Sequence, residues 1–282
     1  MTNAARRRLD TELVRRGLVA TRSEAHDAIA AGIVIVAGAT ADKPARLVAA
    51  NQPVELLGPP ARFVSRGGEK LEGALNRFGV DPHGQAALDA GASTGGFTDC
   101  LLKRGAAHVY SVDVGHGQLD QRLRHDARVS VLERVNVRSL TPDILRQANP
   151  DFVPCTLITA DLSFISLATV VPALTGPVGH EHADLVLLVK PQFEAGRVVV
   201  ARGKGVVRDP EVWLQALVDV SSALREAGTG IMGAMVSSLI GPAGNVEFLL
   251  HAKKGIVAPD PDMVLSAAVS EAVARRDTPH PP

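Results

Sequence analysis

The chain has 282 residues, 46% of them hydrophobic and 21% charged, which suits one large globular domain with or without a small one. No apolar run is long enough to cross a bilayer, and the arginine-rich N-terminus lacks the apolar segment of a secretory signal, so we expect a cytoplasmic protein. The net charge is zero, yet residues 1–70 hold 11 Lys and Arg against 7 Asp and Glu, while residues 71–282 hold 19 against 23. This asymmetry predicts contact with a polyanion at the N-terminal end.

The N-terminal residues predict a small α+β module. We expect an amphipathic helix over 6–17 that ends at Gly17, and a second helix that begins at Thr21 and stops before Gly32. Residues 33–36 then have the pattern of a strand. The whole chain holds one Trp, one Tyr and seven Phe, which leaves little for base stacking. A nucleic acid would therefore be bound mainly through its phosphates and its shape.

Changes in composition mark the domain boundaries. A proline-rich stretch separates the basic module from the rest of the chain, and a polar, proline-rich segment ends it. We therefore expect a module over 1–58, a linker over 59–66, a large domain over 67–276 and a disordered tail over 277–282.

Residues 86–99 have the order strand, glycine loop, helix, which opens a nucleotide-binding α/β sheet. The run is not the G-x-G-x-x-G fingerprint of dinucleotide binding, because Asp89 ends the strand and Gly91 and Gly95 follow at other spacings. An acid at this point would repel a pyrophosphate but can accept hydrogen bonds from an ammonium group or from hydroxyls. S-adenosylmethionine has an amino-acid end and no phosphate, so it fits better than NAD. A tight turn without a ligand is the alternative.

Strand and helix patterns alternate along the rest of the large domain. Helical patterns include 164–174 and 211–227, and the last two strand patterns are joined by a short connection, as in a parallel sheet closed by an antiparallel hairpin. Asp113 ends the second strand, where an acid suits the two ribose hydroxyls of an adenosine cofactor. The predicted fold class is α/β, a Rossmann-like seven-stranded sheet of the methyltransferase kind, with strands at 86–89, 107–113, 128–133, 155–161, 184–190, 230–238 and 246–252.

Four polar residues stand at the ends of predicted elements, where a core would not place them. They are Lys70, Asp161, Lys190 and Glu247. Each of them alone is more typical of a surface charge. Because the carboxyl ends of parallel strands share one edge of the sheet, Asp161 and Lys190 should be neighbours. The joint occurrence of the four residues indicates a catalytic site.

The run RLDTELVRRGLVATRSEAHDAIAAGIVIVAGATADKP at 8–44 resembles an S4 RNA-binding domain in its double Arg, its Thr-Arg pair and its Lys-Pro. A solvated charged helix is the alternative for these arginines. Arg8-Leu9-Asp10 also resembles the catalytic motif of pseudouridine synthases, but here it lies in the S4 run, so we interpret Asp10 as structural. The resemblance implies an RNA-binding surface formed by Arg6, Arg8, Arg22, Lys43 and, beside the linker, Arg66.

The motifs SRGGEKL, LDAGASTGGFTDCLL, ADLSFISLATV, LVKPQFE and GPAGNVE, together with the S4 run, resemble the TlyA family of rRNA ribose 2′-O-methyltransferases, whose members also carry the name haemolysin. In these motifs Lys70, Asp161, Lys190 and Glu247 follow the order of the FtsJ-like catalytic tetrad. The resemblance implies S-adenosyl-L-methionine as methyl donor, cytidines of 16S and/or 23S rRNA in ribosomal subunits as substrate, and capreomycin susceptibility when the methylation is present. The proposed chemistry requires no metal, and from the sequence we expect no membrane contact and find no evident protein partner. The residues that would bind the cofactor are Asp89, Gly91, Ala92, Ser93, Thr94, Gly95, Gly96, Phe97, Asp113, Asn136 and Asp161.

A ribose 2′-hydroxyl is a weak acid, so methyl transfer needs a base or strong stabilisation of the developing alkoxide. We expect Lys190 to be the base, since burial and the charge of Lys70 would favour its neutral amine. Amino-group methylation fits less well because Asp161-Leu-Ser-Phe164 replaces the usual Asn/Asp-Pro-Pro-aromatic motif, and C5 methylation would need a cysteine in the crevice. A non-catalytic RNA-binding assembly factor and a pore-forming haemolysin are the alternatives from other function classes.

Overall fold

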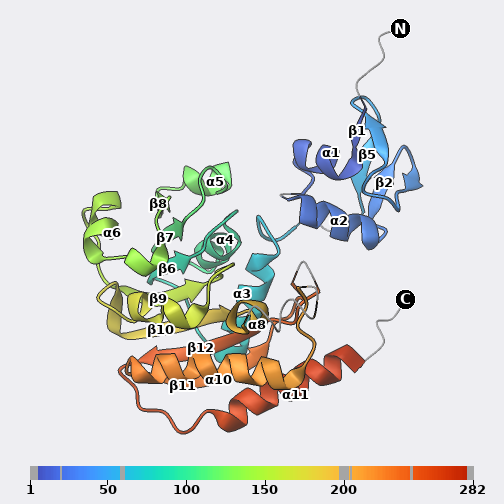
Figure 1. Cartoon of the computed structure of the whole chain (residues 1–282). Helices are drawn as coiled ribbons and strands as arrows, with labels where there is room; N and C mark the ends of the chain where they lie inside the picture. Colours follow the sequence, from blue (N-terminus) through green and yellow to red (C-terminus); the bar gives the residue numbers. More distant parts are fainter. Residues whose placement is uncertain are drawn as a thin grey trace. The chain divides into compact units, whose positions relative to one another are not determined.

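The structure, a computed structural model, describes residues 6–19, 21–57, 61–196, 203, 205–241 and 244–277. The chain divides into two compact units, Met1–Ser65 and Arg66–Pro282 (Figure 1). Residues 58–60, where the module was expected to end and the linker to begin, lie outside the described residues, and so does the expected tail apart from Asp277.

The N-terminal unit is a small α+β fold. Its elements are β1 (Arg6–Arg8), α1 (Leu9–Arg15), α2 (Arg22–Ala30), β2 (Val34–Val36), β3 (Ala39–Thr40), β4 (Leu47–Ala49) and β5 (Val54–Leu56). β1 pairs antiparallel with β4, and β2 lies between β3 and β5. Thr21 caps α2 by accepting a hydrogen bond from the amide of Glu24, as the capping-box pattern predicts. Apolar residues of both helices and of the strands form one core, which includes Leu9, Leu13, Ile29, Val34 and Val48.

The helix expected over 6–17 is shorter at both ends. Arg6–Arg8 form β1 instead, because they pair with Leu47–Ala49 some forty positions later, a partner that helical periodicity cannot reveal. The helix ends at Arg15, and Gly17 follows with φ +68°, a left-handed conformation that glycine adopts without steric cost.

The large unit alternates strands and helices. Its elements are α3 (Gly67–Phe78), β6 (Ala86–Ala90), α4 (Gly96–Lys103), β7 (His108–Asp113), α5 (Gln121–Arg124), β8 (Val129–Glu133), η1 (Val137–Ser139), α6 (Pro142–Ala148), β9 (Cys155–Ala160), η2 (Leu167–Thr169), α7 (Val171–Leu174), β10 (Gly179–Val189), α8 (Pro191–Glu194), α10 (Pro210–Glu226), β11 (Thr229–Val236), β12 (Phe248–Lys254) and α11 (Asp262–Asp277). The strand order is β11-β12-β10-β9-β6-β7-β8. β12 runs antiparallel to β10 and β11, and the pairs from β10 to β8 are parallel. The predicted seven-stranded sheet with a final hairpin is confirmed.

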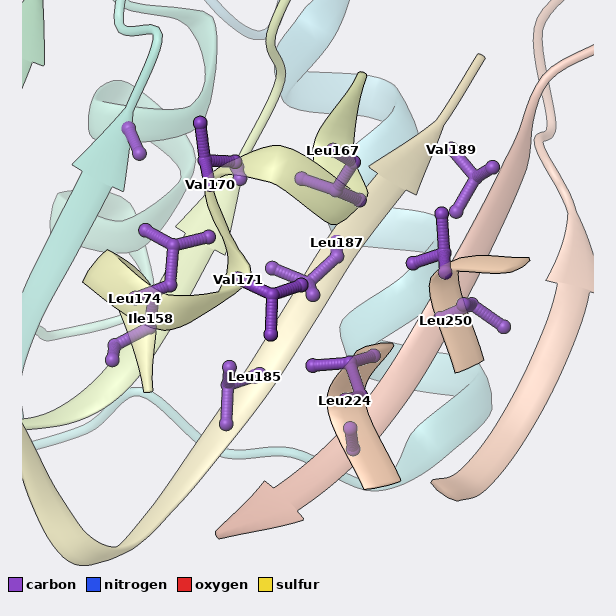
Figure 2. Close-up of a cluster of buried hydrophobic side chains, with 14 of the residues drawn as sticks. Ile158, Leu167, Val170, Val171, Leu174, Leu185, Leu187, Val189, Leu224 and Leu250 are labelled. Carbon is purple, nitrogen blue, oxygen red and sulfur yellow. The ribbon is translucent and has the colours of Figure 1, made fainter. Parts of the chain in front are cut away.

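Both faces of the sheet are covered. One face packs against α7, α10 and α11, and Figure 2 shows part of this core, with Leu185 and Leu187 of β10 among side chains that include Val171 and Leu224. The other face meets α3 and α4, since the Phe78 ring of α3 stacks on His251 of β12. A sheet buried on both faces requires continuous apolar strands, which is why β10 carries the run Leu-Val-Leu-Leu-Val.

Three predicted elements differ in detail. The helix expected over 164–174 is two short pieces, η2 and α7, because the chain first turns through Phe164 at φ +65°. β10 begins at Gly179, five residues before its predicted start, with an irregular register between Gly179 and Asp184. Glu247 precedes β12 instead of lying inside the strand. Among the residues that the structure describes, no helix is long and apolar enough to span a membrane.

Candidate active site

The alternation of side chains along the strands brings the predicted site residues to one face of the sheet. Successive residues of a strand point to opposite faces. Ala160, Val189 and Phe248 belong to the core on the α10 face, so Asp161, Lys190 and Glu247, each one position away, belong to the face covered by α3 and α4. The same parity places Asp89 and Asp113 on this face, because the core on the α10 face contains Leu88, Ala90, Tyr110 and Val112.

Strand register brings three of these residues to the same edge of the sheet. Val189 pairs with Phe248, so Lys190 and Glu247 adjoin this pair on neighbouring strands. Asp161 follows β9, and its amide donates to the carbonyl of Ala90 across a distance of 3.0 Å. The candidate catalytic residues therefore lie next to the glycine loop that follows β6.

Lys190 is held by two partners from the loop after β9. Its Nζ lies 2.6 Å from Asp161 Oδ1 and donates a hydrogen bond of 2.9 Å to Ser163 Oγ. Lys190 is 9% exposed, and the Asp161 side chain is 22% exposed. The two residues expected to be neighbours from their strand ends are thus in direct contact.

Lys70 and Glu247 form a second ion pair, deeper in the protein. Lys70 lies in the first turn of α3, and its Nζ is 2.5 Å from Glu247 Oε2. The side chains of Lys70 and Glu247 are 7% and 2% exposed. Gly241 leaves room for this acid, since a Cβ there would lie 2.6 Å from Glu247 Oε1. A buried pair of this kind has a fixed geometry, because separating the charges would leave each one without water or partner.

The glycines of the loop after β6 are required by backbone conformation and close packing. Gly91 has φ +88°, and a Cβ there would lie 2.5 Å from the carbonyl oxygen of Asp161. Gly95 has φ +97°, and its Cβ would lie 2.3 Å from Leu123 Cδ1. From the sequence we expect these glycines to let the backbone approach a ligand. In the structure a Cβ at Gly91 would meet Asp161 and one at Gly95 would meet Leu123, so the missing side chains also make room for protein atoms.

Asp89 is fully buried at the end of β6. Its Oδ2 accepts a hydrogen bond of 2.6 Å from Thr98 Oγ1, which also lies 2.7 Å from Ser111 Oγ. Its Oδ1 is buried and has no hydrogen-bond partner within the part of the chain that the structure describes. Burial, reinforced by the charge of Asp161, raises the pKa of the Asp89 carboxyl to about 7. One acceptor at the site therefore lacks a donor among the described residues.

Asp113 ends β7 and shapes the loop beside it. Its carboxylate accepts the amide of Ser93 at 2.8 Å and the amide of Gly115 at 2.6 Å. Each carboxylate oxygen can accept a further hydrogen bond, and the next residue, Val114, is 72% exposed. Asp113 therefore combines an acceptor with a neighbouring apolar surface.

The remaining predicted cofactor residues fall into two groups. Ala92, Gly96 and Phe97 are buried and support the loop from inside, while the carbonyl of Thr94 accepts the amide of Asp120. Asn136 is exposed, and its side chain caps η1 by accepting from the amide of Arg138.

In the N-terminal unit, one buried carboxylate gathers three cationic or basic side chains. Asp10 is 0% exposed, and its Oδ2 receives Arg8 Nη2 at 2.9 Å and Arg22 Nη2 at 2.8 Å. His26 Nε2 lies 3.0 Å from the same oxygen. The Arg8 guanidinium, with Arg22 and His26, holds the pKa of the Asp10 carboxyl well below its usual range. Asp10 thus organises the arginines, in keeping with our interpretation of it as structural.

The other predicted RNA-binding residues are not part of this Asp10 cluster. Arg6 is exposed on β1, where it pairs with Ala49. Lys43 is exposed in the segment between β3 and β4. Arg66 is half-buried at the start of α3, and its carbonyl accepts the amide of Glu69.

Comparison with known proteins gives the same division of the chain. The family model of the FtsJ-like methyltransferases matches residues 63–254, and that of the S4 domain matches residues 7–54. The 16S/23S rRNA (cytidine-2′-O)-methyltransferase TlyA of Mycobacterium tuberculosis is 49% identical over 248 residues, which cover 88% of this chain and 90% of that protein. The chain belongs to the TlyA family of FtsJ-like methyltransferases.

Relatives of this TlyA-family chain carry a second name. Hemolysin A of Brachyspira hyodysenteriae is 38% identical over 86% of this chain and 98% of that protein. A solved structure from Streptococcus thermophilus, also named as a haemolysin, has a TM-score of 0.76 and 35% identity, and covers 97% of this chain and 99% of that chain. The fold of both units is thus shared along nearly the whole TlyA-family chain.

Sequence reasoning missed several residues of this TlyA-family site. Ser163 contacts Lys190, and Phe164 is 92% exposed in the same loop. Glu194 accepts hydrogen bonds from Ser166 and Leu167. The motifs ADLSFIS and LVKPQFE contain all of them, but spacing alone does not show which side chains meet. Among the described residues, no group of three or more His, Cys, Asp and Glu side chains could hold a metal ion.

Proposed function

We propose that this methyltransferase transfers the methyl group of S-adenosylmethionine to the ribose 2′-hydroxyl of a cytidine in 16S and/or 23S rRNA. The observation that carries the proposal is the arrangement around Lys190. Its Nζ contacts Asp161 and Ser163 beside the glycine loop. The strand register places Lys190 next to Glu247, which forms the buried ion pair with Lys70. The 49% identical Mycobacterium tuberculosis TlyA, named for cytidine 2′-O-methylation of 16S and 23S rRNA, supports the substrate class.

The residues after β6 and β7 fit S-adenosylmethionine. Asp89 Oδ1, an acceptor without a donor among the described residues, suits the cationic amino group, whose approach would favour the ionised carboxylate. Asp113 can accept the ribose hydroxyls, and Val114 offers an apolar surface for the adenine. The loop from Gly91 to Gly96 would surround the ligand, and the buried Phe97 would support this loop from inside.

The side chains at the strand ends can move the proton that the reaction releases. Bound S-adenosylmethionine supplies the methyl group. Lys190 first releases a proton to water; its neutral Nζ then accepts the proton of the 2′-hydroxyl, and the Asp161 carboxylate at 2.6 Å stabilises the ammonium that forms again. The Lys70 ammonium, fixed by Glu247, stabilises negative charge that develops on the ribose oxygen. The rate enhancement would come chiefly from these fixed positions.

The N-terminal unit would deliver the rRNA. Arg8 and Arg22 are 46% and 61% exposed and stay anchored to Asp10. A guanidinium carries five N–H groups, so each arginine can hold Asp10 and still donate to a phosphate. Arg6, Lys43 and Arg66 would add further phosphate contacts.

The decisive experiment maps 2′-O-methyl groups on rRNA after ribosomal subunits are incubated with the purified protein and radiolabelled S-adenosylmethionine. Lys190→Ala should lower turnover by about 100-fold or more, the usual contribution of a positioned base. Calorimetry should show unchanged cofactor binding. The matched control is Lys103→Ala, which removes an exposed lysine paired with Asp99 on α4 and should keep wild-type turnover.

Each other outcome rejects a specific part of the proposal. Wild-type turnover in Lys190→Ala would reject the assigned base. Methyl groups on bases instead of riboses would reject the reaction. Binding of rRNA without any methyl incorporation by the wild-type protein would favour a non-catalytic assembly factor.

A further inference from the structure

Two segments that are distant in sequence are fastened together at the candidate active site. The first is the loop 161–166 after β9, and the second is the segment 190–194, which contains α8. At one end, Lys190 contacts Asp161 and Ser163, as described above. At the other end, the carboxylate of Glu194 receives donors from the end of the loop and from the start of η2.

Glu194 makes two short hydrogen bonds that connect the segment 190–194 to the end of the loop and to η2. Its Oε2 accepts Ser166 Oγ at 2.6 Å, and its Oε1 accepts the amide of Leu167 at 2.7 Å. Ser166 occupies the N-cap position of η2, but its own side chain does not cap the helix. The cap comes instead from Glu194, the last residue of α8. The Glu194 carboxyl is largely shielded from water, and this burial raises its pKa.

The loop between the two attachments has a strained backbone and a projecting side chain. Phe164 has φ +65°, a conformation that bulky residues rarely adopt, and is 92% exposed. Its ring centroid lies 5.2 Å from that of Phe193, the neighbour of Glu194. Just after the loop, Leu167 is 2% exposed and points into the core beside β10 (Figure 2). Such a loop keeps one conformation only if both of its ends are fixed.

We propose that Glu194 is a positioning residue for methyl transfer. It fixes the loop 161–166 so that Asp161 and Ser163 hold Lys190 in its reactive position. Glu194 touches neither Lys190 nor the predicted cofactor residues through any hydrogen bond that involves the described residues, so it acts through the loop. The inference rests on the proposed function, in which Lys190 is the base.

The test compares two substitutions of Glu194. In Glu194→Ala both hydrogen bonds are lost, and we expect kcat to fall at least 10-fold while KM for ribosomal subunits and Kd for S-adenosylmethionine change by less than about 3-fold. In Glu194→Gln the amide oxygen still accepts from Leu167, so kcat should stay within about 3-fold of wild type. A rescue by the conservative variant separates this role from that of a residue needed for its charge alone.

A matched control removes a helix-capping carboxylate elsewhere. Asp209 is exposed and caps α10 by accepting the amide of Glu211. Asp209→Ala removes this cap and should lower Tm, as Glu194→Ala does, without changing kcat. Ser166→Ala should reproduce part of the kcat loss, and Glu194→Ala combined with Ser166→Ala should be no worse than Glu194→Ala alone, because both residues act through the same contact.

The inference is overturned if Glu194→Ala keeps wild-type kcat. It is also overturned if the loss of kcat in Glu194→Ala comes with an equal loss of cofactor binding, or if Asp209→Ala lowers kcat equally, because either result indicates general destabilisation. These outcomes differ from a failure of the proposed function, in which the wild-type protein itself would not methylate ribose.

Discussion

Each unit of this protein contains a completely buried aspartate, and the pKa values of the two aspartates are shifted in opposite directions. Asp10 and Asp89 are both 0% exposed. The pKa of Asp10 is held well below its usual range by Arg8 and by the other side chains of its cluster. The pKa of Asp89 is raised to about 7, because burial dominates and its hydrogen bond to Thr98 offsets it only partly. Equal exposure therefore does not decide the charge of an acid: Asp10 lies beneath exposed arginines and Asp89 lies deep beside a neutral hydroxyl, so depth and neighbours together set the pKa.

The difference corresponds to two tasks. Around Asp10 one negative charge holds two arginines and a histidine that are 46–61% exposed, which leaves an excess of positive charge at the surface. Such a surface suits a polyanion. In the large unit two buried lysines each face one acid, Lys70 with Glu247 and Lys190 with Asp161. Balanced pairs of this kind have a fixed geometry, which the proposed methyl transfer requires.

The largest effect is expected from breaking the most buried pair. Glu247→Gln leaves Lys70 charged and without its acid partner, so it should lower the free energy of unfolding by about 3–5 kcal/mol and abolish methyl transfer. Asp161→Asn should cost less stability, because the Asp161 side chain is 22% exposed and Lys190 keeps its hydrogen bond to Ser163. Urea unfolding of both variants measures the difference. Equal losses would show that depth of burial does not distinguish the two pairs.

Asp10→Asn tests the anchor of the N-terminal unit. At pH 7 we expect a loss of about 2–3 kcal/mol in the free energy of unfolding, since hydrogen bonds from charged donors are lost. A lowered pKa stabilises the fold above the unfolded pKa of about 3.9, so the wild-type advantage should begin to fall below about pH 4 and should be lost only as the pH falls through the much lower folded pKa. Affinity for rRNA should also fall although the variant gains one positive charge. A rise in affinity would mean that charge, and not arrangement, controls binding.

Asp89→Asn should give the opposite pH dependence. Because the folded pKa of Asp89 is raised to about 7, its contribution to stability is complete below about pH 4 and is lost as the pH rises toward 7. The variant should therefore gain about 4 kcal/mol relative to wild type between pH 4 and pH 8, since a pKa unit is worth about 1.4 kcal/mol. Unfolding free energies across this range provide the measurement. A flat difference would show that Asp89 is ionised at all these pH values.

The smallest effect is expected from single arginines. Arg8→Ala and Arg22→Ala should each weaken rRNA binding about 5- to 10-fold. Each should also reduce the slope of log affinity against log salt concentration by about 0.7–0.9, because one phosphate contact, with its released counterions, is lost. Arg15→Ala is the control, because Arg15 is 47% exposed and bound to another buried acid, Glu12. Binding measured at several salt concentrations should leave Arg15→Ala close to wild type. An equal loss of affinity in Arg15→Ala would show that RNA binding is not confined to the arginines of the Asp10 cluster.

Much of the fold could be predicted because its signals are local. Apolar runs separated by glycine loops and amphipathic stretches revealed the seven strands, and the rule that parallel strands end at one edge placed Asp161 beside Lys190. The prediction was wrong at Arg6–Arg8, where pairing with β4 replaces helix, and at 164–174, where the turn at Phe164 interrupts it. Both errors involve partners or turns that periodicity does not encode.

The alternating α/β order, the glycine loop and the four polar residues at element ends can be predicted from the amino-acid sequence, because each depends on neighbours within a few positions. The pairing of Lys70 with Glu247 and the contact of Glu194 with the Ser166 end of the neighbouring loop follow from the folded chain and not from local patterns. The same is true of the burial of Asp89, with one oxygen unpaired among the described residues, and of the cluster of Arg22 and His26 around Asp10. These contacts join residues up to 177 positions apart, and strand parity, register and burial select them.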